Sequence, residues 1–68
     1  MPKPQKRWVV EKILRENGWV LLRSGGSHDL WGLPDESVTE PIPRHREVSA
    51  GIIGRLIGKL EQVPQSWR

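Results

Sequence analysis

The stretch RSGGSHDLW, residues 23–31, places one histidine directly after two glycines and a serine. Histidine has an ordinary pKa of about 6.5, so one imidazole can both accept and donate a proton near neutral pH. Cleavage of RNA needs a base for the 2′-hydroxyl and an acid for the leaving oxygen, and a positioned histidine contributes roughly 10²–10⁴-fold in either role. His28 is therefore the candidate catalytic residue. The alternative is a polar residue that merely begins a strand.

The residues before His28 could bind the phosphate on which such a base would act. Consecutive backbone N–H groups in a loop form a concave surface that binds anions, and glycine lets a ligand approach the backbone closely. Gly26 and Ser27 occupy this position, and Arg23 adds a fixed positive charge shortly before them. We expect all three to contact RNA. The alternative for SGGS is an ordinary hairpin turn.

A second basic segment, PRHREVS, covers residues 43–49. Three of its residues carry a fixed charge or a titratable ring: Arg44, His45 and Arg46. Guanidinium groups bind phosphate oxygens in pairs, and the N–H groups at the start of the following helix also favour anions. We expect this segment to contact RNA. In the alternative, it is a solvated loop whose arginines pair with Glu47 or Glu40.

All aromatic residues are tryptophans: Trp8, Trp19, Trp31 and Trp67. Nucleic-acid bases stack on exposed tryptophan, whereas small domains more often use this residue to fill the core. We expect Trp19 and Trp31 to lie in the core. Trp67, near the end of the chain, is expected to be exposed and available to a partner.

Composition restricts the class of protein. A chain of 68 residues forms one small domain, and its net charge of +3 with a pI near 10.0 favours an anionic partner, nucleic acid first. The absence of cysteine excludes disulfides and cysteine-ligated zinc, and two histidines alone argue against a structural metal site. No apolar run approaches the roughly 20 residues of a membrane span, and no apolar segment follows the basic N-terminus. We expect a cytoplasmic protein with no metal and no membrane contact.

Hydrophobic periodicity predicts two helices. The first covers residues 7–17 and ends at Gly18, because glycine is favoured just beyond a helix end. The second begins after Ser49, a good N-cap, and is expected to end near residue 62, before Pro64. Its apolar stripe consists of Ile52, Ile53, Leu56, Ile57 and Leu60.

Three short β-rich segments lie between these helices, at residues 19–23, 28–33 and 38–42, separated by the turn sequences SGGS and PDES. Pro41 has no N–H for a ladder, which places the third strand at a sheet edge. Glu40 lies on an otherwise apolar face of that strand, and we expect it to be exposed at the edge.

The order α-β-β-β-α predicts an α+β fold in which two helices cover one face of a three-stranded antiparallel sheet, as in double-stranded-RNA-binding domains. The other face remains open. We assign residues 7–62 to this single domain, residues 1–6 to a loose N-terminal arm, and residues 63–68 to a C-terminal tail.

Several of these segments, taken in order over roughly residues 7–62, resemble the HicA family of type II toxin–antitoxin systems: ENGW, VLLR, GSH, PRH and SAGIIGRLIGKL. The resemblance implies a double-stranded-RNA-binding-like fold and a metal-independent endoribonuclease that cleaves mRNA and arrests translation. It also implies a HicB antitoxin that covers the active surface. The family's catalytic histidine corresponds to His28, after Gly26 and Ser27, and its Pro-x-His step corresponds to Pro43 and His45.

Two positions depart from the family pattern. Asp29 follows the histidine where many members carry a second histidine or another polar residue, and Gly25 stands where many carry a basic residue. A carboxylate beside the scissile phosphate would repel it. Because adjacent strand residues point to opposite faces, Asp29 is compatible with catalysis if it turns away from His28.

Two other functions remain open from sequence. A non-catalytic RNA-binding module would use the same open face and loops to bind RNA by shape. A protein-interaction domain would use its basic surface for an acidic partner, and the helix face formed by Gly51, Gly54 and Gly58 would permit close helix packing. Cleavage of RNA in the presence of EDTA separates the enzyme from both.

Overall fold

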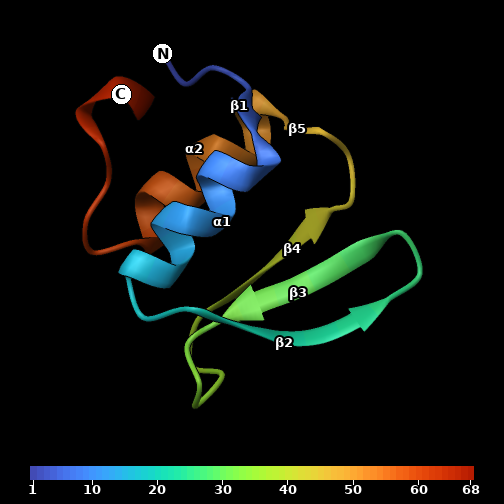
Figure 1. The fold of residues 1–68 in the computed structure, drawn as a ribbon. Coiled ribbons are helices and arrows are strands. Elements are labelled where there is room, and N and C mark those ends of the chain that lie inside the picture. The colour runs from blue at the N-terminus through green and yellow to red at the C-terminus, as the bar shows by residue number, and fades with distance from the viewer.

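The computed structural model describes residues 1–68 and contains a three-stranded antiparallel sheet ordered β2-β3-β4. Its strands are β2 (Val20–Gly25), β3 (His28–Gly32) and β4 (Thr39–Pro43). Both helices, α1 (Arg7–Glu16) and α2 (Ala50–Lys59), lie on one side of this sheet (Figure 1). The predicted α+β fold is therefore confirmed, and each strand begins and ends within two residues of its expected position.

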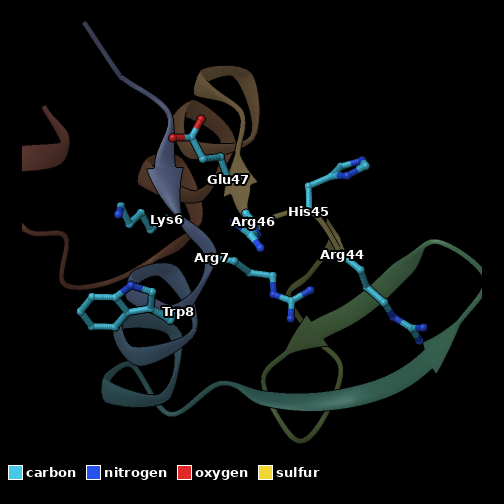
Figure 2. A pocket seen from close by; sticks show the side chains of 7 residues that line it. All are labelled: Lys6, Arg7, Trp8, Arg44, His45, Arg46 and Glu47. Atoms are coloured by element: carbon cyan, nitrogen blue, oxygen red, sulfur yellow. The ribbon is translucent and has the colours of Figure 1, made fainter.

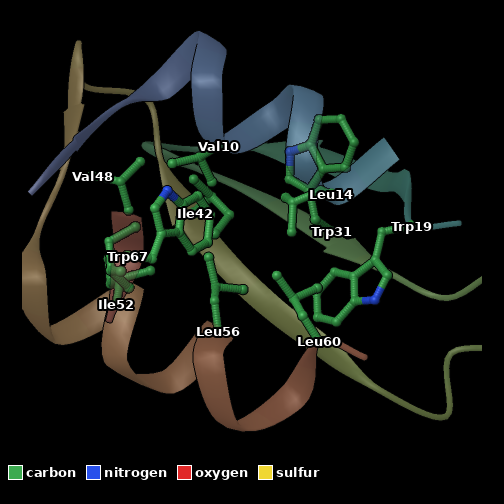
Figure 3. Packing of buried hydrophobic residues seen from close by; sticks show 11 residues of the cluster. Val10, Leu14, Trp19, Trp31, Ile42, Val48, Ile52, Leu56, Leu60 and Trp67 are labelled. Carbon is green, nitrogen blue, oxygen red and sulfur yellow. The ribbon is translucent and has the colours of Figure 1, made fainter. Parts of the chain in front are cut away.

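Alternation along the strands separates the two faces of the sheet. Trp31 and Ile42 point toward the helices and are 3% and 1% exposed, whereas Pro41 points away and is exposed. The buried side chains form one apolar cluster between sheet and helices (Figure 3). It contains Val10, Leu14, Trp19, Trp31, Ile42, Val48, Ile52, Ile53, Leu56, Leu60 and Trp67. Trp19 and Trp31 thus fill the core, as predicted.

Local signals explain the ends of the helices. Gly18, just beyond α1, has a φ of 80°, a left-handed conformation that glycine adopts without steric cost. Ser49 caps α2, since its Oγ accepts the Ile52 N–H at 3.4 Å. The expectation that the second helix reaches residue 62 is wrong. The Gln62 backbone instead pairs with the Asn17 side chain, donating to Oδ1 at 2.8 Å and accepting from Nδ2 at 2.9 Å.

Residues 5 and 6 are not part of a loose arm. They form a short strand, β1 (Gln5–Lys6), which pairs antiparallel with β5 (Glu47–Val48) in a separate two-stranded sheet. The Arg7 N–H extends this pairing by donating to the Arg46 carbonyl at 2.8 Å. The chain between α2 and its end likewise folds back onto the core and includes a short 3-10 helix, η1 (Gln65–Trp67).

Two side-chain predictions are also wrong. Trp67 is 1% exposed and belongs to the core, and the exposed tryptophan is Trp8, at 65%. Glu40 is only 2% exposed, because its carboxylate accepts from Arg55 Nε at 3.0 Å and from Lys59 Nζ at 2.6 Å. Two cations from α2 thus make a buried carboxylate tolerable on the helix-facing side of β4.

Candidate active site and nucleic-acid interface

The β2–β3 hairpin positions the candidate catalytic histidine at its tip. Gly25 pairs with His28 across the hairpin, and Gly26 and Ser27 form the connecting two-residue turn. Gly26 has a φ of 57°, which a glycine at the first turn position adopts readily and which matches the twist of the two strands. The glycines therefore set the hairpin geometry and leave the His28 side chain exposed to solvent.

The Ser27 hydroxyl fixes the imidazole of His28. Ser27 Oγ lies 3.0 Å from Nδ1, and a hydroxyl can either donate to this nitrogen or accept from it. When Nδ1 carries the proton and donates, Nε2 has a free lone pair and can act as a base. When Ser27 donates instead, Nε2 carries the proton and can act as an acid. The same contact supports both roles.

Arg44 links the hairpin tip to β4 and to the helix side of the sheet. Its backbone N–H donates to the Ser27 carbonyl at 3.0 Å, and its Nε donates to Asp29 Oδ1 at 2.7 Å. Asp29 follows His28 on β3, so its carboxylate points to the opposite face of the sheet. The Arg44 guanidinium therefore lies on the helix side, away from the imidazole.

The Arg44 hydrogen bond lowers the pKa of Asp29 below its ordinary value; partial burial opposes this shift, whereas the Ser24 hydroxyl and the charges of Arg44 and Arg7 add to it. Asp29 is thus held as a carboxylate by cations on its own side of the sheet. Its negative charge is paired and turned away from His28, as the alternation of strand residues predicts.

Arg23 makes no side-chain hydrogen bond or ion pair with His28 or with residues 43–49. It lies on β2 and pairs with Glu36 at 3.5 Å, with both side chains largely exposed. An exposed pair of this kind contributes little to stability and is screened by salt. Its guanidinium is therefore free to exchange Glu36 for a phosphate.

The largest cavity, about 590 Å³, lies where β1 and β5 meet the start of α1. Figure 2 shows Trp8 and Lys6 toward one end, and Arg7, Arg46 and Arg44 toward the other, with His45 pointing outward. We refer to this cavity as the basic pocket. It is lined by Lys6, Arg7, Trp8, Arg44, His45, Arg46 and Glu47.

Positive charge dominates the basic pocket. Four of its lining residues are lysine or arginine and one is glutamate, whose carboxylate points away from the arginines in Figure 2. Arg7 pairs with Glu11 at 3.6 Å and Arg44 with Asp29, whereas Lys6 and Arg46 make no ion pair. The first turn of α1 contains no acidic residue and has no side-chain cap, so its N–H groups add partial positive charge.

The sequence-predicted residues thus occupy two neighbouring surfaces. Gly26, Ser27 and His28 form the hairpin tip, and Arg44, His45 and Arg46 line the basic pocket. The surfaces are adjacent because His28 pairs with Pro43, the residue before Arg44, in the β3–β4 register.

Sequence reasoning missed three lining residues of the pocket: Lys6, Arg7 and Trp8. A signal was present, since KRW places a tryptophan directly after two cations at the start of a helix. No group of three or more His, Asp or Glu side chains is placed to hold a metal ion. Neither α-helix has the length and hydropathy to cross a membrane.

A comparison with models of protein families matches residues 9–63 to the HicA toxin of bacterial toxin–antitoxin. The match covers most of the chain and includes both the hairpin tip and the segment 43–49. The chain belongs to the HicA toxin family. No curated protein and no solved structure matches it. The HicA match begins one residue after Trp8, so the β1 side of the basic pocket lies outside it.

Proposed function

We propose that this HicA protein is a metal-independent endoribonuclease that cleaves mRNA and so arrests translation. On this proposal it acts in the cytoplasm, and a HicB-type antitoxin covers its active surface. The observation that supports it best is the exposed imidazole of His28, held through Nδ1 by Ser27 while Nε2 has no hydrogen-bond partner within the protein. Membership of a toxin family supplies the biological setting.

The proposed reaction uses the imidazole as base. Nε2 of His28 takes the proton of a ribose 2′-hydroxyl, and the 2′-oxygen forms a bond to the adjacent phosphorus as the bond from phosphorus to the 5′-oxygen breaks. The leaving 5′-oxygen takes a proton from water or from His45. The products are a 2′,3′-cyclic phosphate and a 5′-hydroxyl, and the proposed reaction requires no metal ion.

The proposed RNA contacts are the turn and the arginines around it. Gly26 and Ser27 offer backbone to a phosphate beside His28, while Arg23 approaches from β2. The second set of contacts consists of Arg44, His45 and Arg46. With three or four phosphates neutralised, the logarithm of the binding constant falls with the logarithm of salt with a slope of about −2 to −3. Such binding is weak and depends strongly on ionic strength.

The first prediction concerns His28→Ala. Because His28 is the one titratable side chain of the hairpin tip, the variant should lose cleavage by about 10²-fold or more while keeping the fold, since the side chain is exposed. The assay incubates purified protein with RNA in EDTA and follows the 2′,3′-cyclic phosphate ends. His45→Ala is tested beside it, and undiminished cleavage by that variant would assign the proton on the leaving oxygen to water. Undiminished cleavage by His28→Ala would refute the assignment, and cleavage abolished by EDTA would refute metal independence.

A non-catalytic RNA-binding module is the alternative, and one observation favours it. The guanidinium of Arg44 and the imidazole of His28 lie on opposite faces of the sheet, so RNA held in the basic pocket need not contact the imidazole. The same incubation decides the matter. A binding module shifts the RNA in a native gel and leaves it intact, whereas the enzyme produces fragments.

A further inference from the structure

We infer that the basic pocket is a subsite for one nucleotide of single-stranded RNA, in which the Trp8 indole stacks on an unpaired base while Arg7 and Arg46 bind the neighbouring phosphate. The inference rests on the proposed function for its ligand class, RNA, and adds to it a base-contacting residue outside the region matched to the family.

Trp8 is exposed where the other tryptophans are not. Its exposed fraction is 65%, against 3% for Trp19 and Trp31 and 1% for Trp67. It is the one hydrophobic residue in the lining of the pocket, so no apolar neighbour there shields its ring. Exposing an indole forgoes the burial that the chain obtains from its other three. A flat aromatic surface among cations is the arrangement on which single-stranded nucleic acids stack.

The cations of the pocket differ in how much charge they leave for a ligand. Arg44 is committed to Asp29 at 2.7 Å, and Arg7 makes only a loose pair with Glu11 at 3.6 Å. Arg46 has no carboxylate partner. The charge available to an anion therefore comes from Lys6 and Arg46, which make no ion pair, and from the loosely paired Arg7. Arg7 and Arg46 lie next to the first turn of α1, whose N–H groups also favour an anion.

The two halves of the pocket are held together before any ligand binds. The Arg7 N–H donates to the Arg46 carbonyl at 2.8 Å, and Lys6 pairs with Glu47 in the β1–β5 register. Both segments are anchored in the core by fully buried neighbours, Val10 from α1 and Val48 from β5. A ligand therefore does not have to order this backbone, which lowers the cost of binding.

The geometry favours an unpaired base over an acidic protein segment. Acidic peptide side chains are satisfied by the cations alone and make no use of an exposed indole. A base in a duplex is covered by its neighbours on both sides, so only an unpaired base offers Trp8 a free face. Single-stranded RNA supplies that face and a phosphate one backbone step away.

The test uses 2′-O-methyl RNA about eight nucleotides long, which has no free 2′-hydroxyl and so binds without being cleaved. Because Trp8 alone among the tryptophans is exposed, quenching of tryptophan fluorescence during titration reports its stacking. We expect the oligonucleotide to quench the emission, and an abasic strand of equal length and charge to quench it little. The variants lack the reporter indole, so their affinity is measured from the fluorescence anisotropy of an end-labelled oligonucleotide. By this measurement Trp8→Ala should weaken binding by about 5- to 100-fold, and Trp8→Phe by much less.

Leu21→Ala is the matched control, since Leu21 is 47% exposed and does not line the pocket; its affinity should be unchanged. Equal binding of the abasic strand, or an unchanged affinity in Trp8→Ala, would overturn the subsite. Quenching by poly-glutamate as strong as by the oligonucleotide would also overturn it, in favour of a protein partner. Neither result depends on cleavage, so the subsite and the role of His28 fail separately.

Discussion

The buried carboxylate of Glu40 gives the most demanding test of the structure. Glu40 is 2% exposed, whereas its partners Arg55 and Lys59 are 58% and 36% exposed. Loss of the cations would leave a charge in the interior without compensation, while loss of the carboxylate would leave two cations that water can solvate. We therefore predict a strongly asymmetric response to substitutions on the two sides of this network.

The expected magnitudes follow from that asymmetry. Removing the partner of a buried charge costs about 3–5 kcal/mol, and partial exposure of the cations places the double variant Arg55→Met/Lys59→Met at the lower end, about 3 kcal/mol. A chain of 68 residues has a total stability of about 3–10 kcal/mol, so this is a large fraction. For a domain of this size the melting temperature should fall by about 12–24 °C.

Glu40→Leu supplies the complementary measurement. Alone it should cost about 1 kcal/mol, because the two cations become solvated and Lys59 keeps its 2.7 Å bond to the Thr39 carbonyl. Added to the double variant, it should restore most of the lost stability by removing the unpaired charge. Urea unfolding followed by tryptophan fluorescence measures all four proteins. If Glu40→Leu fails to rescue the double variant, or alone costs as much, the reasoning is wrong.

Two further predictions concern packing and pH. Gly32→Ala should destabilise the protein by about 1–3 kcal/mol, because a Cβ at this position would overlap the Val38 carbonyl. Gly58 has open space around it, so Gly58→Ala should stabilise the protein by about 0.5–1 kcal/mol. Thermal melts measure both variants, and equal changes in melting temperature would contradict this packing. Arg44 lowers the pKa of Asp29, and the Ser37 N–H and hydroxyl lower the pKa of Asp35. The two ionised carboxylates therefore stabilise the folded protein at any pH above the ordinary pKa of aspartate, and this stabilisation is lost as the pH falls through the lowered pKa values. The melting temperature should therefore drop below about pH 4, less steeply in Asp29→Asn/Asp35→Asn, and an unchanged slope would argue against these contacts.

Local patterns were sufficient for much of the fold. The hydrophobic periodicity of its residues and Gly18 predicted α1, Ser49 predicted the start of α2, and the short turn sequence before His28 predicted the hairpin. Each signal acts within a few residues along the chain. The exposed histidine at a turn followed from the same local logic, since a two-residue connection leaves the first residue of the next strand at the tip.

The features that could not be predicted depend on partners distant in sequence. A two-residue strand such as β1 has no periodicity, and its partner β5 lies some forty residues later. The strand pattern alone predicts that Glu40 is exposed at the sheet edge, whereas in the folded protein α2 places Arg55 and Lys59 against its carboxylate. The burial of Trp67 and the exposure of Trp8 have the same origin, because the packing of all the helices and strands against one another determines which tryptophans are buried. The basic pocket was missed for this reason.

The two contacts of Arg44 have a consequence for how an RNA chain would be read. Its backbone N–H holds Ser27, in the turn directly before the imidazole, and its guanidinium, bonded to Asp29 on the strand that follows, lines the pocket at the end opposite Trp8 (Figure 2). Arg44 thereby connects the hairpin tip to the wall of the pocket, and the β1–β5 pairing connects that wall to the start of α1, so the distance between a base stacked on Trp8 and the backbone at His28 would be constant. On the proposed function the protein acts as a molecular ruler, and any base preference of the indole would reappear at a constant offset from every cleavage position.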